Sequence, residues 1–333
     1  MSPAEAAPAH DDATIDRAVA RMSLRERALD PQLPERALPA VTGSGPDGPY
    51  RLVASRRANP RAVGVVTTQM LAPSDPEALW TSLRSAELEL MWEGDADAVD
   101  ELLGEWIGRS APDLGEPGDW ESSLRLRVPS RDSALVRPLL SRGFALIDVT
   151  AIRVGGRGAD AEAALERLAA AGVVLRPATP ADAELLGVMD SELLAHDLQH
   201  GGLALRERAS ATLQQGIEER LGIDPEWTWV IEQAGEPVGF LSIEIDRERH
   251  REKCADTGRV AYIQAMYLRP TVRGGGLGEA VVDFAHGRLE TAGFDRLLLS
   301  YAALNPRSGP FWCRMGYRPL WSTWHRKPAR QLV

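Results

Sequence analysis

The stretch 273–278 (RGGGLG) holds the residues whose types and spacing most clearly allow chemistry. Glycine has no Cβ, so successive backbone N–H groups can point into one space without steric conflict. Residues 279–289 carry apolar side chains at roughly helical spacing, and a helix start adds unpaired N–H groups and the positive end of its dipole. A glycine turn before a helix therefore predicts an anion site, in particular for phosphate or pyrophosphate.

A strand is predicted directly before this turn. Residues 260–268 (VAYIQAMYL) are rich in β-branched and aromatic side chains, and Pro270 ends the run. A P-loop would need Lys and Ser or Thr after its last glycine, where this chain has Glu279 and Ala280. A dinucleotide G-x-G-x-x-G fingerprint would also put its third glycine at Glu279. Neither of these phosphate sites fits.

A second group of candidate residues follows the next predicted strand. Residues 296–301 (RLLLSY) form an apolar run, Asn305 comes next, and 311–317 (FWCRMGY) is a short aromatic helix that ends in Gly-Tyr. The spacing Arg-x-x-Gly-x-Gly, filled by Arg273, Gly276 and Gly278, resembles motif A of the GNAT acyltransferase superfamily, and the second group resembles its motif B. The resemblance covers residues from about 174 to 328.

The resemblance implies a fold, a co-substrate and a reaction. The fold is α/β, with tandem GNAT-like mixed central sheets flanked by helices, and the co-substrate is acetyl-CoA. An amine attacks the thioester carbon directly, and backbone N–H groups at 266–268 polarise the thioester carbonyl. The residues expected to bind CoA are Met266, Tyr267, Leu268, Arg273, Gly274, Gly275, Gly276, Leu277, Gly278, Asn305 and Phe311.

One position departs from the family pattern. The usual thiolate donor is a Tyr four residues before the motif B glycine, and this chain has Trp312 there, whose indole is a poor acid. Another group or water then supplies the proton, or protonation is unimportant, or activity is lost; we expect residual activity from orientation alone. The catalytic candidates are Glu244, Tyr262 and Tyr301, with Cys313 as a further possible donor.

The acceptor side is expected around 189–202 (MDSELLAHDLQHGG), which follows the first helix of the second half and roofs the acceptor in the family. Its carboxylates suit a cationic small-molecule amine, although a solvated helix face is the alternative. A metal site on the two histidines is not expected, because nothing else clusters to complete it. The acceptor candidates are Glu192, His196, Asp197 and Trp312. The later aromatic residues Trp321, Trp324 and His325 form either an aromatic acceptor pocket with Trp312 or packing between the two halves.

Composition limits the other functions. A net charge of −10 and a pI near 5.2 argue against nucleic acid or an anionic membrane as partner. Two cysteines exclude a disulfide framework or a four-cysteine zinc site. No apolar run reaches transmembrane length and the start lacks a signal-like apolar region, so a cytoplasmic location is expected. The sequence does not decide whether the chain forms a homodimer.

The length of 333 residues predicts two domains. The expected ranges are an N-terminal extension at 1–49, a degenerate GNAT-like domain at 50–155 and an acetyl-CoA-binding domain at 173–333. Residues 124–146 echo 298–320, each with a strand, a short helix and a Gly-aromatic pair. In the first copy, residues 89–94 (ELMWEG) occupy the position of the glycine turn, and their glutamates would repel a pyrophosphate. The first copy is therefore expected to have a structural role and not to bind CoA. Coincidental α/β similarity is the alternative.

The remaining elements follow from hydrophobic periodicity. In the strand 260–268, simple alternation places Tyr262, Gln264, Met266 and Leu268 on one face and Ile263, Ala265 and Tyr267 on the other. Helices are expected at 13–29, 77–91, 96–107, 133–141 and 161–171, and strands at 50–56, 62–70, 120–128, 144–154, 228–232 and 238–245.

The leading hypothesis is a GNAT N-acyltransferase that uses acetyl-CoA and a small amine. One rival is a GNAT transferase with a longer acyl group or a donor other than CoA. The other rival is a CoA-binding module without turnover, which Trp312 in the acid position would suit.

Overall fold

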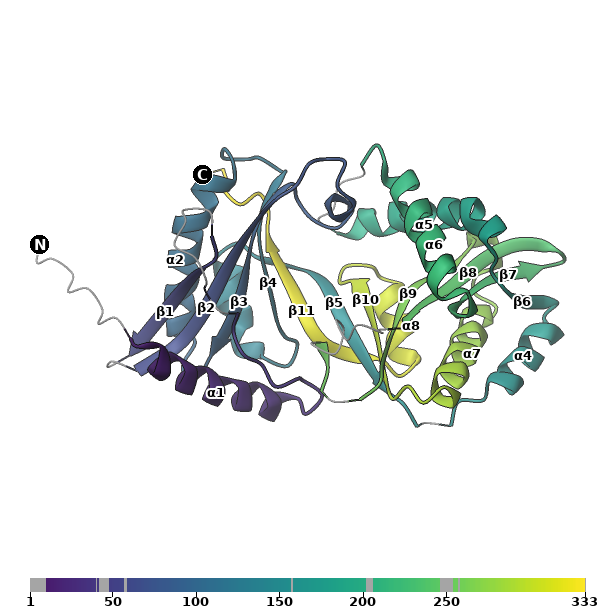
Figure 1. The fold of residues 1–333 in the computed structure, drawn as a ribbon, viewed down its shortest axis with the longest axis horizontal. Helices are drawn as coiled ribbons and strands as arrows, with labels where there is room; N and C mark the ends of the chain where they lie inside the picture. Colours follow the sequence, from purple (N-terminus) through teal and green to yellow (C-terminus); the bar gives the residue numbers. More distant parts are fainter. Residues whose placement is uncertain are drawn as a thin grey trace, which may run out of the picture. The chain divides into compact units, whose positions relative to one another are not determined.

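The computed structural model contains two compact units, each built from strands and helices (Figure 1). The first unit comprises Met1–Asp148 and Leu320–Val333, and the second comprises Val149–Pro319. The predicted α/β class, with mixed sheets flanked by helices, is confirmed, whereas the predicted domain ranges stay a prediction. No helix among the described residues has the length and apolarity to cross a membrane. The structure describes residues 10–39, 41, 48–56, 59–156, 158–201, 206–245, 254–256 and 258–332.

The sheet of the first unit begins with three antiparallel strands, β1-β2-β3. Strand β4 then pairs parallel to β3, and β11 pairs antiparallel to β4. Helix α2 connects β3 to β4, as a parallel pair requires. The elements are α1 (Asp12–Leu29), β1 (Tyr50–Arg56), β2 (Asn59–Met70), β3 (Arg84–Trp92), α2 (Asp97–Leu114), β4 (Ser122–Pro129), α3 (Val136–Ser141), β5 (Ala145–Val154) and β11 (Arg318–Arg326).

One predicted element in this unit is wrong. Residues 77–91 were expected to form a helix, but most of that range is strand β3. Glu and Leu are good helix formers, yet here Leu88 and Leu90 are buried while Glu87 and Glu89 are exposed, which is the two-residue period of a strand. The helix predicted at 96–107 is present and continues to Leu114.

The second unit has the sheet order β10-β9-β8-β7-β6, in which only β9 and β10 run parallel. Helices α5 and α6 cover one face of this sheet, and α4 and α7 cover the other (Figure 1). The elements are α4 (Ala161–Ala170), β6 (Val173–Pro177), α5 (Ala183–Asp197), α6 (Ala209–Ile223), β7 (Thr228–Gln233), β8 (Glu236–Ile245), β9 (Val260–Leu268), α7 (Leu277–Thr291), β10 (Arg296–Ala302) and α8 (Ser308–Arg314).

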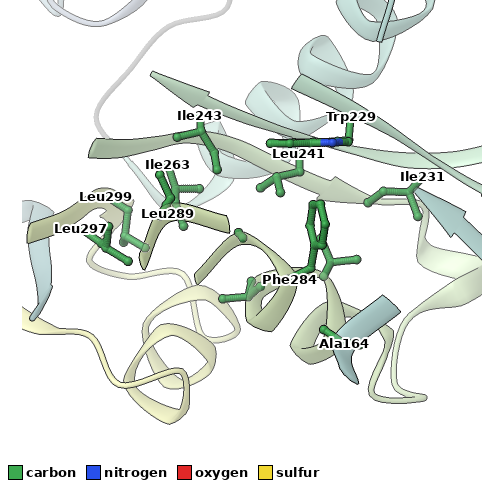
Figure 2. Close-up of a cluster of buried hydrophobic side chains, with 14 of the residues drawn as sticks. Ala164, Trp229, Ile231, Leu241, Ile243, Ile263, Phe284, Leu289, Leu297 and Leu299 are labelled. Atoms are coloured by element: carbon green, nitrogen blue, oxygen red, sulfur yellow. The ribbon is translucent and has the colours of Figure 1, made fainter. Parts of the chain in front are cut away.

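The larger core of the second unit lies between the sheet and helices α4 and α7. Figure 2 shows Phe284 of α7 beside Trp229 and Leu241, and the two rings meet edge to face with centroids 5.3 Å apart. On the other face, Leu186 and Ile217 of helices α5 and α6 pack on the sheet. Burial on both faces explains why these strands read as near-continuous apolar runs.

The predicted internal repeat is present in the topology. In each copy of the repeat three antiparallel strands lead into a helix, a parallel strand, a short helix and a final strand. The first copy is β1-β2-β3-α2-β4-α3-β5 and the second is β7-β8-β9-α7-β10-α8-β11. Gly143 and Gly316 close the two short helices with φ of +77° and +88°, a conformation that favours glycine. The next residue, Phe144 or Tyr317, is buried in each case.

The C-terminal aromatic residues are divided between the two units. Trp312 belongs to the core of the second unit, and Trp324 belongs to the core of the first. Within the first unit the Trp321 ring lies beneath the guanidinium groups of Arg36 and Arg127, at 5.4 and 4.8 Å from its centroid. The aromatic acceptor pocket and the packing between the two halves both stay predictions.

Candidate active site

Strands β9 and β10 separate part-way along their length. Their parallel ladder joins Val260–Tyr262 to Arg296–Leu298, and among the described residues no further pair follows. On its other edge β9 stays paired with β8 as far as Leu268. The backbone groups of residues 263–268 that face β10 therefore lack a strand partner. Apart from the Leu268 carbonyl, which accepts from Arg273 Nε, they are available to a polar ligand.

A β-bulge in β9 changes which side chains share a face. The pairing steps from Ser242↔Ala265 to Ile243↔Ile263, so Gln264 is an extra residue on this strand. Ile263 packs with Met266 and Leu268 on the α7 side, while Ala265 and Tyr267 pack on the α5 and α6 side. Tyr262 pairs with Glu244, and cross-strand partners share a face.

The face assignment made from simple alternation is thus wrong. It grouped Tyr262 and Gln264 with Met266 and Leu268, but the extra residue reverses the alternation at Gln264. The Oε1 atom of Gln264 is buried and has no hydrogen-bond partner among the described residues. A buried, unpaired amide oxygen is costly unless a ligand or water meets it, so the bulge adds a polar group that the sequence did not reveal.

The glycine turn has the conformation that an anion cradle needs. Gly274 and Gly276 have φ of +92° and +80°, and the space around the missing Cβ atoms of residues 274–276 is open. Within the described chain, the N–H groups of these three glycines make no hydrogen bond. Gly276 is the N-cap of the 15-residue helix α7, whose first turn adds its own unpaired donors.

Arg273 is held beside the open edge of β9. Its Nε donates to the Leu268 carbonyl at 2.7 Å, and its guanidinium lies 5.5 Å from the Tyr267 ring centroid. Among the described residues it has no carboxylate partner. The remaining guanidinium N–H groups can therefore donate to a phosphate.

The predicted CoA residues meet at one place. A Cβ on Gly278 would lie 3.3 Å from Met266 Cε and 3.5 Å from Phe311 Cε2, so the turn, β9 and α8 are in close contact there. Asn305 stabilises the loop before α8, because its Oδ1 accepts from the N–H groups of Arg307 and Ser308 at 3.0 and 3.2 Å. Leu277 is buried in the same core.

Two hydrogen bonds connect the predicted CoA residues to the predicted acceptor residues. Asn305 Nδ2 donates to Asp197 Oδ1 at 2.9 Å, and Tyr267 Oη donates to Glu192 Oε2 at 2.5 Å. Burial raises the pKa of Asp197, and burial with Glu192 beside it raises the pKa of Tyr267 to about 12. These bonds hold α5 against strand β9 and hold its last residue against the loop of Asn305.

The other candidates are placed as follows. His196 and His200 are in edge contact, with ring centroids 5.2 Å apart, and the described residues hold no group of three or more His, Cys, Asp or Glu that could bind a metal. Tyr301 packs against the start of α8, 3.2 Å from the Cβ position of Gly309. Trp312 is only 8% exposed and contacts the rings of Phe311 and Tyr317.

A cavity of about 340 Å³ lies between α5 and the start of α6. It is lined by Ser191, Leu194, Arg206, Glu207, Ala209 and Ser210. None of these residues belongs to the glycine turn or to the open edge of β9, so we assign the cavity no part in CoA binding.

The described β3–α2 connection of the first unit does not repeat the glycine turn. Its β3–α2 connection is only the four residues 93–96, and Glu93 there takes ion pairs from Arg21 and Arg61 at 2.8 and 3.5 Å. The following helix starts with Asp97 and Asp100 in its first turn. Carboxylates at this helix start would repel a phosphate.

Sequence reasoning passes over Arg220 of α6, and it counts Asp190 of α5 among the carboxylates of the acceptor segment 189–202 without making it a site candidate. Burial raises the pKa of Asp190 to about 6, with the charge of Arg220 opposing the shift. Burial lowers the pKa of Arg220, with Asp190, Glu244 and Glu219 opposing. The sequence did hold a signal, since Arg220 follows Leu213 and Ile217 by seven and three residues on the buried side of its helix.

The pKa of Asp190 predicts a pH-dependent stability. Its folded value is above its ordinary value of 3.8, so the folded protein holds this proton more tightly, and stability falls as the pH rises from about 4 to 6. Asp190→Asn should remove that loss, which is at most about 3 kcal/mol. We expect the melting temperatures of variant and wild type to converge at pH 4 and the variant to be more stable at pH 8. Equal curves at pH 8 would contradict this assignment.

Comparison with known proteins gives a family for part of the chain. Residues 195–317 match the model of the Acetyltransferase (GNAT) family. No curated protein sequence gives a match. A solved GCN5-related N-acetyltransferase from Sphaerobacter thermophilus is 13% identical with a TM-score of 0.57, and the alignment covers 98% of this chain and 96% of that chain. At this identity the likeness shows the fold alone.

Two further solved structures are less similar. A tandem GNAT protein from the clavulanic acid biosynthesis pathway has a TM-score of 0.44 and 13% identity, with 96% of this chain and 98% of that chain covered. A predicted acetyltransferase with acetyl-CoA from Clostridium acetobutylicum has a TM-score of 0.35 and 19% identity, with 44% of this chain and 90% of that chain covered. At these scores we draw no conclusion from either structure.

Proposed function

We propose that this chain, in which residues 195–317 form a GNAT acetyltransferase domain, transfers an acetyl group from acetyl-CoA to the amine of a small molecule. The observation that carries the proposal is the glycine turn at the start of α7, directly after the strand whose edge lies open beside β10. An anion cradle next to unpaired backbone donors suits a ligand with a pyrophosphate and a thioester carbonyl.

The residues present fit acyl-CoA. Arg273 and the N–H groups of residues 274–278 would hold the pyrophosphate, and Phe311 with Met266 would line the path of the pantetheine arm. The bound donor supplies an activated acyl group as a thioester. The open edge of β9 at Met266, Tyr267 and Leu268 would orient the acyl carbonyl and polarise it.

The protein's own residues would then orient the amine and the thioester and transfer protons to and from them. The attacking amine must lose a proton, and we propose Glu244 as the group that accepts it. Its support is its position on the face that α5 and α6 cover, across from Tyr262 at the last β9–β10 pair. Tyr262 and Tyr301 are the candidates to return a proton to the leaving thiolate. Trp312 does not replace them, because it is buried against aromatic rings and its indole is a poor acid.

Glu244→Gln should lower kcat/KM by about 10²–10⁴-fold, since the amide keeps the shape but cannot accept the amine proton. The acidic limb of the pH dependence of kcat/KM should flatten with it. Glu232→Gln is the matched control, because Glu232 of β7 accepts from Arg176 at 2.7 Å and has no part in the proposed chemistry. Equal kcat/KM and an unchanged pH profile in Glu244→Gln would remove Glu244 from the mechanism.

The test of the function is release of free thiol from acetyl-CoA in the presence of a panel of amines, with the acetylated product identified by mass spectrometry. Amine-dependent release supports the transferase. Tight acetyl-CoA binding without release from any amine would favour a non-catalytic CoA-binding module, the second candidate, for which the loss of an acid at Trp312 is the favouring observation. Faster turnover with longer acyl-CoA thioesters would reassign the donor.

A further inference from the structure

Two neighbouring strands of the first unit bring an arginine, a histidine and a serine together. In the antiparallel pair of β4 and β11, Arg125 is the direct cross-strand partner of His325. Such partners share a face of the sheet, with their Cβ atoms roughly 4.5–5.5 Å apart. Ser123 precedes Arg125 by two residues on β4, so it lies on the same face, about 7 Å along the strand. The strand register therefore places all three side chains on one stretch of the sheet.

This stretch does not belong to the main core of the first unit. Leu124 and Leu126, which alternate with Ser123 and Arg125 along β4, are part of the core that includes helix α2. Ser123 and Arg125 therefore point to the opposite face of the sheet. Apolar packing on that core does not account for them.

The three side chains are buried to different degrees and lack partners. Ser123 is fully buried, His325 is 8% exposed and Arg125 is half-buried. The Oγ atom of Ser123 and the Nε atom of Arg125 are enclosed by the protein and have no hydrogen-bond partner. Among the described residues, neither the Arg125 guanidinium nor the His325 ring makes a hydrogen bond or an ion pair. Unpaired polar groups in such a place cost free energy, which a ligand that pairs with them would recover.

The charge that lacks a partner in this set is a single positive one. Burial lowers the pKa of His325 to about 3, so its ring is neutral at neutral pH. Glu87 is the neighbour of Arg125 on β3, but it is exposed and makes no ion pair with Arg125 within the described chain. A water molecule can meet a hydroxyl, but it carries no charge to offset a guanidinium. The group that fits is an anion whose oxygens accept from a guanidinium and from an imidazole N–H.

We infer that Ser123, Arg125 and His325 form a binding site for a small molecule that carries a carboxylate. The terminal nitrogens of Arg125 would hold the two carboxylate oxygens in a fork, and His325 would donate a further hydrogen bond. Ser123 would donate at the enclosed end of the site. A carboxylate carries the one negative charge that Arg125 lacks, whereas the carboxylate of Glu87 on the next strand would repel a more highly charged phosphate.

The inference does not depend on the proposed function. All three residues belong to the first unit, and the glycine turn belongs to the second. The first copy of the repeat would then have a ligand site of its own, built on β4 and β11 and not at the start of a helix.

The test is direct binding of matched probes to the full chain, followed by ligand-observed NMR at constant pH and ionic strength. Benzoate and acetate are compared with benzamide and acetamide, which are similar in shape but carry no charge. The better carboxylate should bind saturably, with a Kd at least about tenfold lower than that of its amide. Arg125→Met should raise the Kd of that carboxylate at least about tenfold and remove its advantage over the amide. Ser123→Ala should raise the Kd about threefold, because one hydrogen bond is lost.

Three further variants or readouts separate this role from a structural one. Arg109→Met is the matched control, because Arg109 is exposed on α2, where it lies 4.1 Å from the Tyr50 ring centroid, and its loss should leave the Kd unchanged. Removing a charge without a partner should leave the melting temperature of ligand-free Arg125→Met equal to or above that of the wild type. Arg125→Lys keeps the charge but not the fork, so it should also weaken carboxylate binding, and it carries the test if Arg125→Met does not fold.

Several results would overturn the inference. One is that neither carboxylate binds more tightly than its amide. Another is an unchanged Kd of the better carboxylate in folded Arg125→Met or, where that variant does not fold, in Arg125→Lys. A third is that inorganic phosphate binds more tightly than both carboxylates and loses this affinity in the Arg125 variants, which would assign the site to a different class of anion.

Discussion

Gly276→Asp should lower the affinity for acetyl-CoA by well over tenfold, which is more than about 1.4 kcal/mol. Gly276 is the N-cap of α7, and the space beyond its missing Cβ is open. A carboxylate placed there would face the pyrophosphate directly and would also satisfy the helix-start donors that the phosphate needs. The measurement is the Kd for acetyl-CoA by calorimetry on folded protein.

The matched control is Gly276→Asn. Gly276 has φ of +80°, so any side chain costs some strain, but Asn and Asp tolerate this conformation better than other residues and share their size. The difference between the two variants therefore reports the charge alone. Gly275→Asp offers a second check, because Gly275 has open space and no positive φ. Unchanged acetyl-CoA affinity in folded Gly276→Asp would show that the pyrophosphate lies elsewhere.

The glycine turn could be predicted from the sequence because local chemistry determines it. Successive glycines and a helical apolar pattern specify backbone conformation within a few residues, and the structure has that conformation at Gly274 and Gly276. The echo between 124–146 and 298–320 was also readable, since each copy repeats a strand, a short helix and a left-handed glycine.

Two features could not be predicted from the sequence, because each depends on how a strand pairs with its neighbours. The bulge at Gln264 is defined by the pairing of β9 with β8, and no pattern within 260–268 signals an extra residue. The sequence of strand β3 predicts a helix, because Leu and Glu favour helices intrinsically and its alternation must be weighed against that preference.

The largest loss of stability is expected from Asp132→Ala in the first unit. The side chain of Asp132 is 2% exposed and binds Arg25 of α1 with both carboxylate oxygens, at 2.8 and 2.9 Å. Its Oδ2 also accepts from Trp92 Nε1 at 2.8 Å, and Arg25 lies 3.9 Å above the Trp92 ring. Removing the carboxylate leaves a guanidinium and an indole N–H without their acceptor, which typically costs about 3–5 kcal/mol.

Two comparisons make that result specific. Asp12→Ala removes the exposed ion pair of α1 with Arg51, and it should cost less than about 1 kcal/mol because solvent screens the pair. Adding Arg25→Met to Asp132→Ala should recover part of the loss, since no uncompensated charge then remains buried. Unfolding is followed by urea titration at constant pH. A cost for Asp132→Ala no greater than that for Asp12→Ala would contradict the role of the buried pair.

The same variant tests how the two copies of the repeat divide their roles. In the first unit the carboxylates near the start of α2 take ion pairs from α1 and β2, as Glu93 does with Arg21 and Arg61. Helix α1 also packs Ile15, Val19 and Met22 against the sheet of this unit. Carboxylates at this position in the second copy would repel a phosphate. In the first copy Glu93 instead helps to hold helix α1 through its ion pair with Arg21. Asp132→Ala should therefore lower stability while leaving the Kd for acetyl-CoA in the folded protein within about twofold, since the anion cradle belongs to the other copy. A parallel loss of acetyl-CoA affinity would show that the first copy contributes to the cofactor site.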